Sequence, residues 1–326
     1  MEANSSNYSI PQSTIDRLLA SQTPSIRYYS YKNLLNLTDD HPLVIATRTQ
    51  IADADHVKTI SAAQDTEGYW YSERHYYGPK YRSSHWSMLL LSELAVPPET
   101  PALQRGADFM IRRMLDEQHV YYAVSSYINK DQSGFCCYWG NWLRYQLYCG
   151  RGDQPLVQEV IDIVSADVTR KGRCLYNQNL PCAWGVIRSL FGLALIPVAM
   201  RTGKIRDAIQ QGIGFILDEH DLTAADYPTP GRIHPIWHKT SFPLFYQADI
   251  LFTLRVLAEV KALNHSGAQK ALRWLENKRN ADGTWRGSSP FKSRSHPFLS
   301  KGDTPDQWVT LQALSVLAAA KQQAAE

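Results

Sequence analysis

Apolar side chains recur along most of this chain at steps of three and four residues, the spacing of helices that bury one face. The pattern is clearest over residues 269–277 and 308–318. No segment alternates between apolar and polar residues as a half-buried strand does. The sequence therefore predicts an all-α protein with helices at about 10–19, 24–35, 42–53, 55–64, 83–95, 101–116, 139–149, 154–168, 183–201, 205–218, 243–262, 265–278 and 306–322.

Two short segments, far apart in the chain, share one arrangement of turn and helix. Asp-Thr-Glu-Gly-Tyr-Trp at 65–70 and Asp-Gly-Thr-Trp at 282–285 both place a glycine shortly before a tryptophan. Glycine favours a turn there because it adopts backbone angles that other residues resist. An apolar helix with a second tryptophan in its first turn follows each segment. We interpret the two segments as copies of one repeat, in which Trp70 and Trp285 pack back on a neighbouring repeat.

These turns and helix starts resemble the repeats of the squalene-hopene cyclase and protein prenyltransferase β-subunit superfamily. Weaker copies are found at 131–145, 181–194 and 242–254, so the resemblance covers roughly residues 60–320. That superfamily builds α/α toroids, in which inner and outer helices alternate around an apolar cavity. The resemblance therefore implies an (α/α)6-type toroid, which needs the whole chain, residues 1–326, as a single domain.

The motifs that set the reaction in these families are absent from the chain. Squalene-hopene-type cyclases protonate an alkene with the middle aspartate of an Asp-x-Asp-Asp motif, and the nearest string here, Asp53-Ala-Asp55, lies outside the matched repeats. Zinc-dependent prenyltransferases hold their metal with Asp, Cys and His, but their Asp-x-Cys step is missing. Basic residues near the predicted cavity mouth that suit a phosphate or carboxylate are Lys80, Arg82, Arg144 and Lys239.

Three cysteines are predicted to gather at one end of the inner helices: Cys137 and Cys182 at helix starts, and Cys174 in the preceding loop. Simple packing is one interpretation, because thiols are often buried. Zinc binding is a second, although no Cys-x2-Cys pair exists. Histidines for a fourth zinc ligand are His85, His234 and His238. In the third interpretation the thiols exchange protons with an alkene or alcohol, which is similar to the chemistry of linalool dehydratase-isomerase.

One carboxylate is predicted inside an apolar helix. Asp249 falls within 243–262, where an unpaired carboxylate is costly, so such a residue is usually paired or functional. Its structural interpretation is a helix cap or an ion pair with Arg255. We expect Asp249 and the three cysteines to face a common cavity, and the catalytic candidates are Cys137, Cys174, Cys182, His238 and Asp249.

Aromatic residues crowd the same loops and helix starts. Their rings suit an apolar chain, and their faces stabilise a developing carbocation by cation–π attraction. Packing between repeats is the alternative role for any one of them. The predicted substrate-binding residues are Tyr76, Tyr77, Lys80, Tyr81, Trp86, Trp139, Asn141, Trp184, Trp237, Phe245 and Tyr246.

Charge and cysteine content limit the partners and the compartment. Lys and Arg number 34 against 31 Asp and Glu, a balance that gives no reason to expect nucleic acid or an anionic membrane as partner. The sequence shows neither an export signal at its start nor an apolar run long enough to span a membrane. Five cysteines, an odd number, favour free thiols. We therefore expect a soluble cytoplasmic protein; its oligomeric state is left open.

These observations lead to one functional hypothesis and two alternatives. The leading hypothesis is a cyclase, isomerase or lyase that uses acid–base chemistry, without a cofactor, on an apolar terpenoid-like molecule of isoprenoid or polyketide type. The first alternative is a non-catalytic protein that binds a hydrophobic ligand or serves as a scaffold. The second is a zinc-dependent transferase similar to the prenyltransferases.

Overall fold

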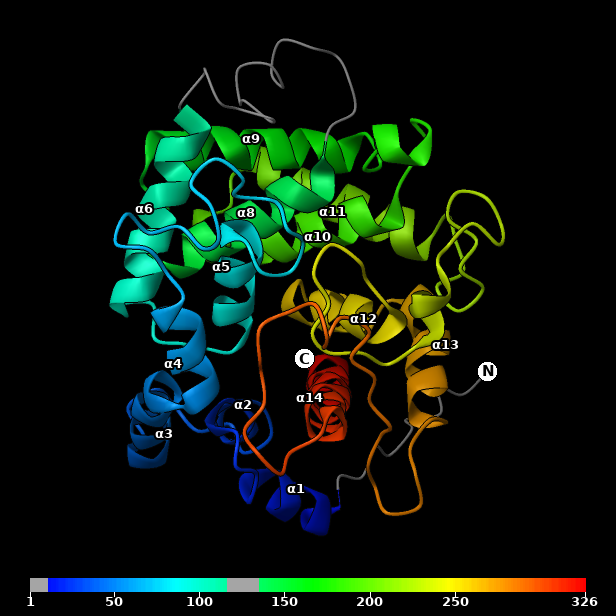
Figure 1. Cartoon of the computed structure of the whole chain (residues 1–326). Coiled ribbons are helices and arrows are strands. Elements are labelled where there is room, and N and C mark those ends of the chain that lie inside the picture. The colour runs from blue at the N-terminus through cyan, green and yellow to red at the C-terminus, as the bar shows by residue number, and fades with distance from the viewer. Residues whose placement is uncertain (1–10, 116–134) are drawn as a thin grey trace.

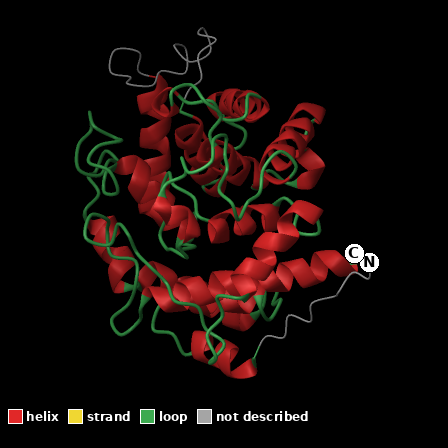
Figure 2. Cartoon of the chain, turned by 90° about the vertical axis from the view of Figure 1, so that its right-hand side faces the viewer, coloured by secondary structure: helices red, strands yellow, loops and turns green. Residues whose placement is uncertain are grey.

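The computed structural model describes residues 11–115 and 135–326. Within them the chain forms α-helices, short 3-10 helices and loops, with no strand, as Figure 2 shows. This confirms the predicted all-α class. The α-helices are α1 (Gln12–Leu19), α2 (Pro24–Asn33), α3 (Pro42–Asp53), α4 (Asp55–Ala62), α5 (Ser84–Glu93), α6 (Pro101–Leu115), α8 (Cys136–Tyr148), α9 (Pro155–Thr169), α10 (Ala183–Ala194), α11 (Gly203–Leu217), α12 (Ile250–Glu259), α13 (Ser266–Glu276) and α14 (Pro305–Ala325).

The helices contact one another in an order compatible with the expected toroid (Figure 1). Contacts run from α2 to α14, then to α12, α10, α8 and α5. The Tyr29 hydroxyl of α2 donates to the carbonyl of Glu93, the last residue of α5, at 3.2 Å, which connects the two ends of this series. Each remaining helix packs on one or more members of this series or on a neighbouring helix, for example α6 on α5 and α13 on α12.

The two turns interpreted as repeats have the same geometry. The indole Nε1 of Trp70 donates to the carbonyl of Ile60 at 2.7 Å, and that of Trp285 donates to the carbonyl of Leu275 at 2.8 Å. The preceding glycines lie at φ values of +96° and +81°, the left-handed region that favours glycine. Both indoles are almost fully buried. The two tryptophans therefore join each turn to the helix before it.

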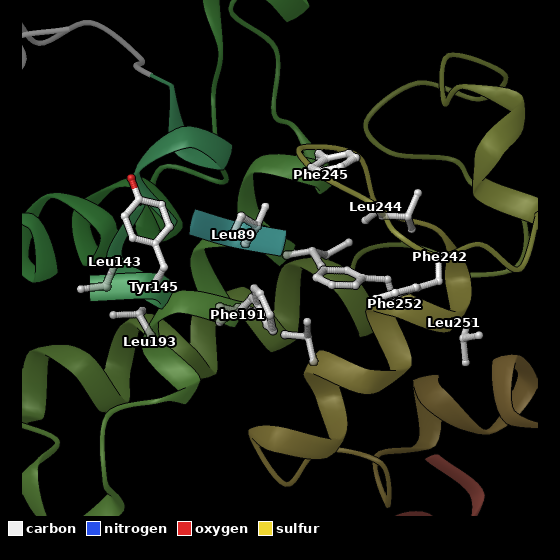
Figure 3. Close-up of a cluster of buried hydrophobic side chains, with 14 of the residues drawn as sticks. Leu89, Leu143, Tyr145, Phe191, Leu193, Phe242, Leu244, Phe245, Leu251 and Phe252 are labelled. Carbon is white, nitrogen blue, oxygen red and sulfur yellow. The ribbon is translucent and has the colours of Figure 1, made fainter. Parts of the chain in front are cut away.

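Apolar side chains from several helices meet in the core. Figure 3 shows side chains of α5, α8, α10 and α12 packed together, with the rings of Phe191 and Phe252 5.1 Å apart. Every residue of α5 is buried, including Glu93. An ionic group therefore lies inside this core, where Arg188 and Arg255 approach the Glu93 carboxylate at 3.7 Å and 3.4 Å.

Several predicted helix boundaries are wrong near the candidate site. The helix expected at 139–149 begins at Cys136, and the one expected at 183–201 ends at Ala194, shortly before Pro197. The helix expected at 243–262 begins only at Ile250, with Asp249 as its N-cap, and ends at Glu259. Residues 131–134 of the weak repeat copy at 131–145 lie outside the described residues. None of the helices described in the structure has both the length and the apolar character of a membrane span.

Candidate active site

Three thiols line one cavity of about 530 Å³, which we call the thiol cavity. Its walls come from the start of α8, the loop before α10, and loops around residues 77–80, 227–234 and 246. The lining residues are Tyr77, Lys80, Phe135, Cys137, Cys174, Tyr176, Asn177, Cys182, Ala183, Trp184, Tyr227, Arg232, Ile233, His234 and Tyr246. Cys137, Cys174 and Cys182 therefore line the same cavity, as expected from the sequence.

Close packing of α8 against α10 brings two of the thiols to the same end. A Cβ on Gly140 would lie 2.2 Å from the carbonyl oxygen of Arg188, and one on Gly192 would lie 2.6 Å from that of Gly140. Only glycine permits this approach. Cys137 lies in the first turn of α8, and Cys182 is the residue that precedes α10. The close packing of the two helices therefore brings both cysteines to the same end of the pair.

The third thiol is held by a tight loop. The carbonyl of Cys174 accepts backbone N–H groups of Asn177 and Asn179, both at 2.9 Å, and Cys174 forms an isolated bridge with Leu180. Residues 178 and 179 both have positive φ values, which turn the chain back toward α10. This loop places Cys174 and Cys182 on the same wall of the cavity.

The cavity thiols are protonated at neutral pH. Burial raises the pKa of Cys182 to about 11, and the pKa values of Cys137 and Cys174 are raised by the same cause. The five cysteines are thiols that form no disulfide bond, as the odd number predicted. Neutral thiols in an aromatic cavity can donate a proton to a bound molecule.

Aromatic and basic groups complete the walls. The rings of Trp184 and Tyr246 meet edge to face at 6.0 Å, and the Lys80 ammonium lies 4.5 Å from the centre of the Tyr246 ring. The Trp184 indole Nε1 is buried and has no hydrogen-bond partner among the described residues.

Six predicted substrate-binding residues line neither the thiol cavity nor the second cavity described below. They are buried in the core or in loop contacts: Tyr76, Trp86, Trp139, Asn141, Trp237 and Phe245. The Trp86 indole donates to the Tyr77 carbonyl at 2.8 Å, and the Trp237 indole donates to the Leu222 carbonyl at 2.9 Å. The Asn141 amide donates to the Phe245 carbonyl at 2.9 Å. These side chains are therefore part of the packed core around the cavities, and Trp86 bonds the backbone of the lining residue Tyr77.

Asp249 also lies outside the thiol cavity, and the expectation that it faces the cysteines is wrong. It is the N-cap of α12, with its carboxylate accepting the backbone N–H groups of Phe252 at 2.7 Å and Ser241 at 2.8 Å. This is the capping role considered as its structural interpretation. The side chain is fully buried, and burial raises its pKa to about 7.

We predict that Asp249 makes stability depend on pH between about 4 and 7. Its folded-state pKa of about 7 exceeds the unfolded value of about 3.9, so its stabilising contribution is complete below about pH 4 and is lost as the pH rises through 7. Over that window the free energy of unfolding of the natural protein, relative to Asp249→Asn, should fall by up to about 1.4 kcal/mol per pH unit. Chemical denaturation of both proteins at several pH values measures this. Parallel stability curves would contradict the assignment.

A second cavity, of about 1,100 Å³, adjoins the first. The two cavities share Lys80, His234 and Tyr246. Tyr81, His238 and Lys239 line the second cavity, so His238 is not grouped with the thiols. Of the other expected basic residues, Arg82 is exposed nearby with its guanidinium 3.5 Å from the Ser293 carbonyl, whereas Arg144 lies elsewhere and pairs with Glu259.

Some lining residues were not singled out from the sequence. Tyr176, Asn177, Tyr227, Arg232 and Ile233 come from loops, and no periodic pattern marks which loop residues turn toward a cavity. The neighbouring His234 was considered only as a zinc ligand. It lies four residues before His238 and follows the Pro-Gly turn at 230–231. This is the local sequence feature that could have drawn attention to the loop as part of a site.

The zinc alternative lacks a site in the part of the chain that the structure describes. Across residues 11–115 and 135–326, no three or more His, Cys, Asp or Glu side chains are grouped so as to hold a metal ion. Comparison with protein-family models, with curated proteins and with solved structures gives no match. The site's own geometry is therefore the basis for a functional argument.

Proposed function

We propose that this protein is an acid–base catalyst, a lyase, isomerase or cyclase, that acts on an apolar small molecule in the thiol cavity. The single observation that carries the proposal is the grouping of Cys137, Cys174 and Cys182 on one aromatic-lined cavity. Its volume of about 530 Å³ falls within the usual range for small-molecule sites. Isoprenoid alcohols and alkenes are the substrate class that best suits these walls.

A thiol can supply both proton-transfer steps of a dehydration. It gives its proton to the hydroxyl oxygen of an alcohol, and water leaves with both electrons of the carbon–oxygen bond. The resulting thiolate then removes a proton from the adjacent carbon, and that C–H electron pair forms the new double bond. An alcohol becomes an alkene and water, and the thiol is restored. The raised thiol pKa favours the second step because it makes the thiolate a strong base.

The aromatic rings have a matching role. A carbocation formed between the two proton transfers is stabilised by ring faces, and Tyr77, Trp184 and Tyr246 supply rings in the cavity wall. The same rings keep water away from the cation. Their arrangement suits isomerisation and cyclisation as well as elimination, since each of these begins with protonation of an alkene or alcohol.

Incubation with isoprenoid alcohols and alkenes in heavy water tests the proposal. A thiol that has exchanged its proton delivers deuterium, so mass spectrometry should find deuterium bound to carbon in recovered alkene or in a rearranged product. We expect Cys182→Ser to abolish this incorporation. Cys149→Ser is the matched control, because Cys149 is a free, buried cysteine that does not line the thiol cavity.

The catalytic proposal would be overturned if the alkenes and alcohols bind without any deuterium incorporation. That outcome would instead support a protein that only binds a hydrophobic ligand. Incorporation that survives substitution of all three cavity cysteines would show that the thiols are not the proton donors.

A further inference from the structure

The second cavity, which we call the basic cavity, is lined by cations without a carboxylate. Its permanently charged lining residues are Lys80, Lys239, Lys278, Arg286 and Arg294. His234 and His238 add two further basic side chains, and no Asp or Glu is among the residues that line it in the described structure. The whole chain has a formal net charge of only +3, so this grouping is local and is not a result of overall composition.

The cations of the basic cavity are not used in ion pairs. None of the five forms a salt bridge with a carboxylate among the described residues, whereas Lys171, Lys204 and Lys270 on other exposed surfaces are each paired. Three of the five contact rings instead: Lys80 lies over Tyr246, Arg294 lies 5.3 Å from the centre of the Tyr81 ring, and Lys278 lies 4.7 Å from the centre of the Trp274 ring. Grouped like charges repel one another, and a bound anion relieves that repulsion.

A buried amide with an unused polar atom lies in the same wall. Gln247 is 6% exposed, and its side-chain Oε1 has no hydrogen-bond partner among the described residues, while its Nε2 lies 3.4 Å from the Tyr81 hydroxyl. Because that hydroxyl both donates and accepts, rotating the amide exchanges its two ends and still leaves one of them without a partner. With the NH₂ group in the unused position, Gln247 offers an uncharged donor beside the cations.

Tyr81 itself has an unusual backbone. Its φ of +76° is a conformation that a bulky residue rarely adopts, and such strain clusters at ligand sites. The ring is 3% exposed and stacks on Phe291 with ring centres 4.5 Å apart. The strained residue is therefore held firmly in the wall of the basic cavity.

Two segments that carry cations are joined by a backbone bridge. Phe242 donates its N–H to the Ser288 carbonyl, and Ser288 donates to the Thr240 carbonyl, both at 2.9 Å. The Asp249 carboxylate holds the same bridge through the backbone N–H of Ser241. Lys239 and Arg286 flank this bridge. The fold therefore sets the distance between the backbones of these two residues before any ligand binds.

We infer that the basic cavity binds the oxyanion end, a phosphate or a carboxylate, of an amphiphilic molecule whose apolar part occupies the thiol cavity. The two cavities share Lys80, His234 and Tyr246, so one molecule can extend from one into the other. The inference rests on the proposed function for the apolar part and names the substrate class more closely. Lys239 and Arg286 are the anchoring cations, and Gln247 and Tyr81 line the same basic cavity.

Calorimetric binding of four probes tests this inference: inorganic phosphate, decyl phosphate, decanoate and decanol. At least one of the two anionic chains should bind about tenfold or more tightly than decanol, since charge-assisted hydrogen bonds are strong. Arg286→Gln and Lys239→Gln should each weaken that binding about tenfold and leave decanol binding unchanged. Lys292→Gln, on the same loop but outside the lining, is the matched control and should change nothing.

The four probes separate the two proposals. If decanol binds as tightly as both anionic chains, or if Lys292→Gln weakens binding as much as Arg286→Gln, the oxyanion site is overturned while the thiol cavity stands. If inorganic phosphate binds and loses affinity in Arg286→Gln but no chain adds affinity, the anion site stands and the apolar part in the thiol cavity is overturned. The relative affinity of decyl phosphate and decanoate identifies the preferred oxyanion.

Discussion

Replacing Trp285 with alanine should lower the free energy of unfolding by about 3–5 kcal/mol, the usual cost of removing a buried aromatic side chain. The indole is fully buried, and its Nε1 donates to the Leu275 carbonyl at 2.8 Å. Its backbone N–H donates to the Thr310 hydroxyl at 3.0 Å, which connects the turn to α14. The substitution therefore leaves a cavity and an unpaired carbonyl between α13 and α14.

Trp274→Ala is the matched control for this experiment. Trp274 lies in α13, is partly exposed, and has the Lys278 ammonium 4.7 Å from its ring centre. Its removal should cost clearly less, which denaturant unfolding of the two variants compares directly. Probe binding per folded molecule should survive in Trp285→Ala. A well-folded Trp285→Ala protein of unchanged stability that no longer binds would show that this tryptophan belongs to the site.

Replacing Arg188 with methionine should destabilise the protein by a similar amount, about 3–5 kcal/mol, because it removes one member of a buried ionic group. The guanidinium is fully buried and donates twice to the Gln247 carbonyl, at 2.6 Å and 3.1 Å. It also lies 3.8 Å from the centre of the Phe252 ring and 3.7 Å from the Glu93 carboxylate. Methionine fills part of the space but leaves Glu93 and the Gln247 carbonyl less well satisfied.

A second substitution distinguishes charge from packing at this position. Glu93→Gln in the Arg188→Met background should recover part of the lost stability, since it removes the buried charge that Arg188 compensates. Lys204→Met, which breaks an exposed pair with Asp162, should cost no more than about 1 kcal/mol. Equal losses in Arg188→Met and Lys204→Met would contradict the importance assigned to the buried group.

The sequence predicted the helices and the repeat turns because both depend on local signals. Apolar spacing marked most helices to within a few residues, and glycine followed by tryptophan marked the turns at Trp70 and Trp285. The grouping of three cysteines at one end of α8 and α10 followed from the repeat interpretation. All three line one cavity.

The sequence could not predict which aromatic side chains face the cavity and which face the neighbouring helices. All residues of α5 are buried, so apolar spacing cannot separate the side facing a cavity from the side facing other helices. Trp86 was expected in the cavity because it lies at the start of α5, but it is fully buried and its indole donates to the carbonyl of Tyr77, a lining residue. Asp249 was misplaced because α12 begins only at Ile250, so that Asp249 caps the helix instead of lying within it. The loop before α12 also pairs with Ser288 through Thr240 and Phe242, a contact between residues distant in the chain. The basic cavity depends on the same pairing.

The most direct measurement of the central claim is a crystal structure of the protein soaked with a terminally brominated decanol. The account predicts an anomalous bromine peak inside the thiol cavity, in contact with Trp184, Tyr246 and at least one of the three thiols. The peak should disappear in a variant that fills the space, such as Ala183→Trp, since Ala183 lies in the cavity wall. A bromine peak at another site, with the thiol cavity empty at saturating ligand, would contradict the account.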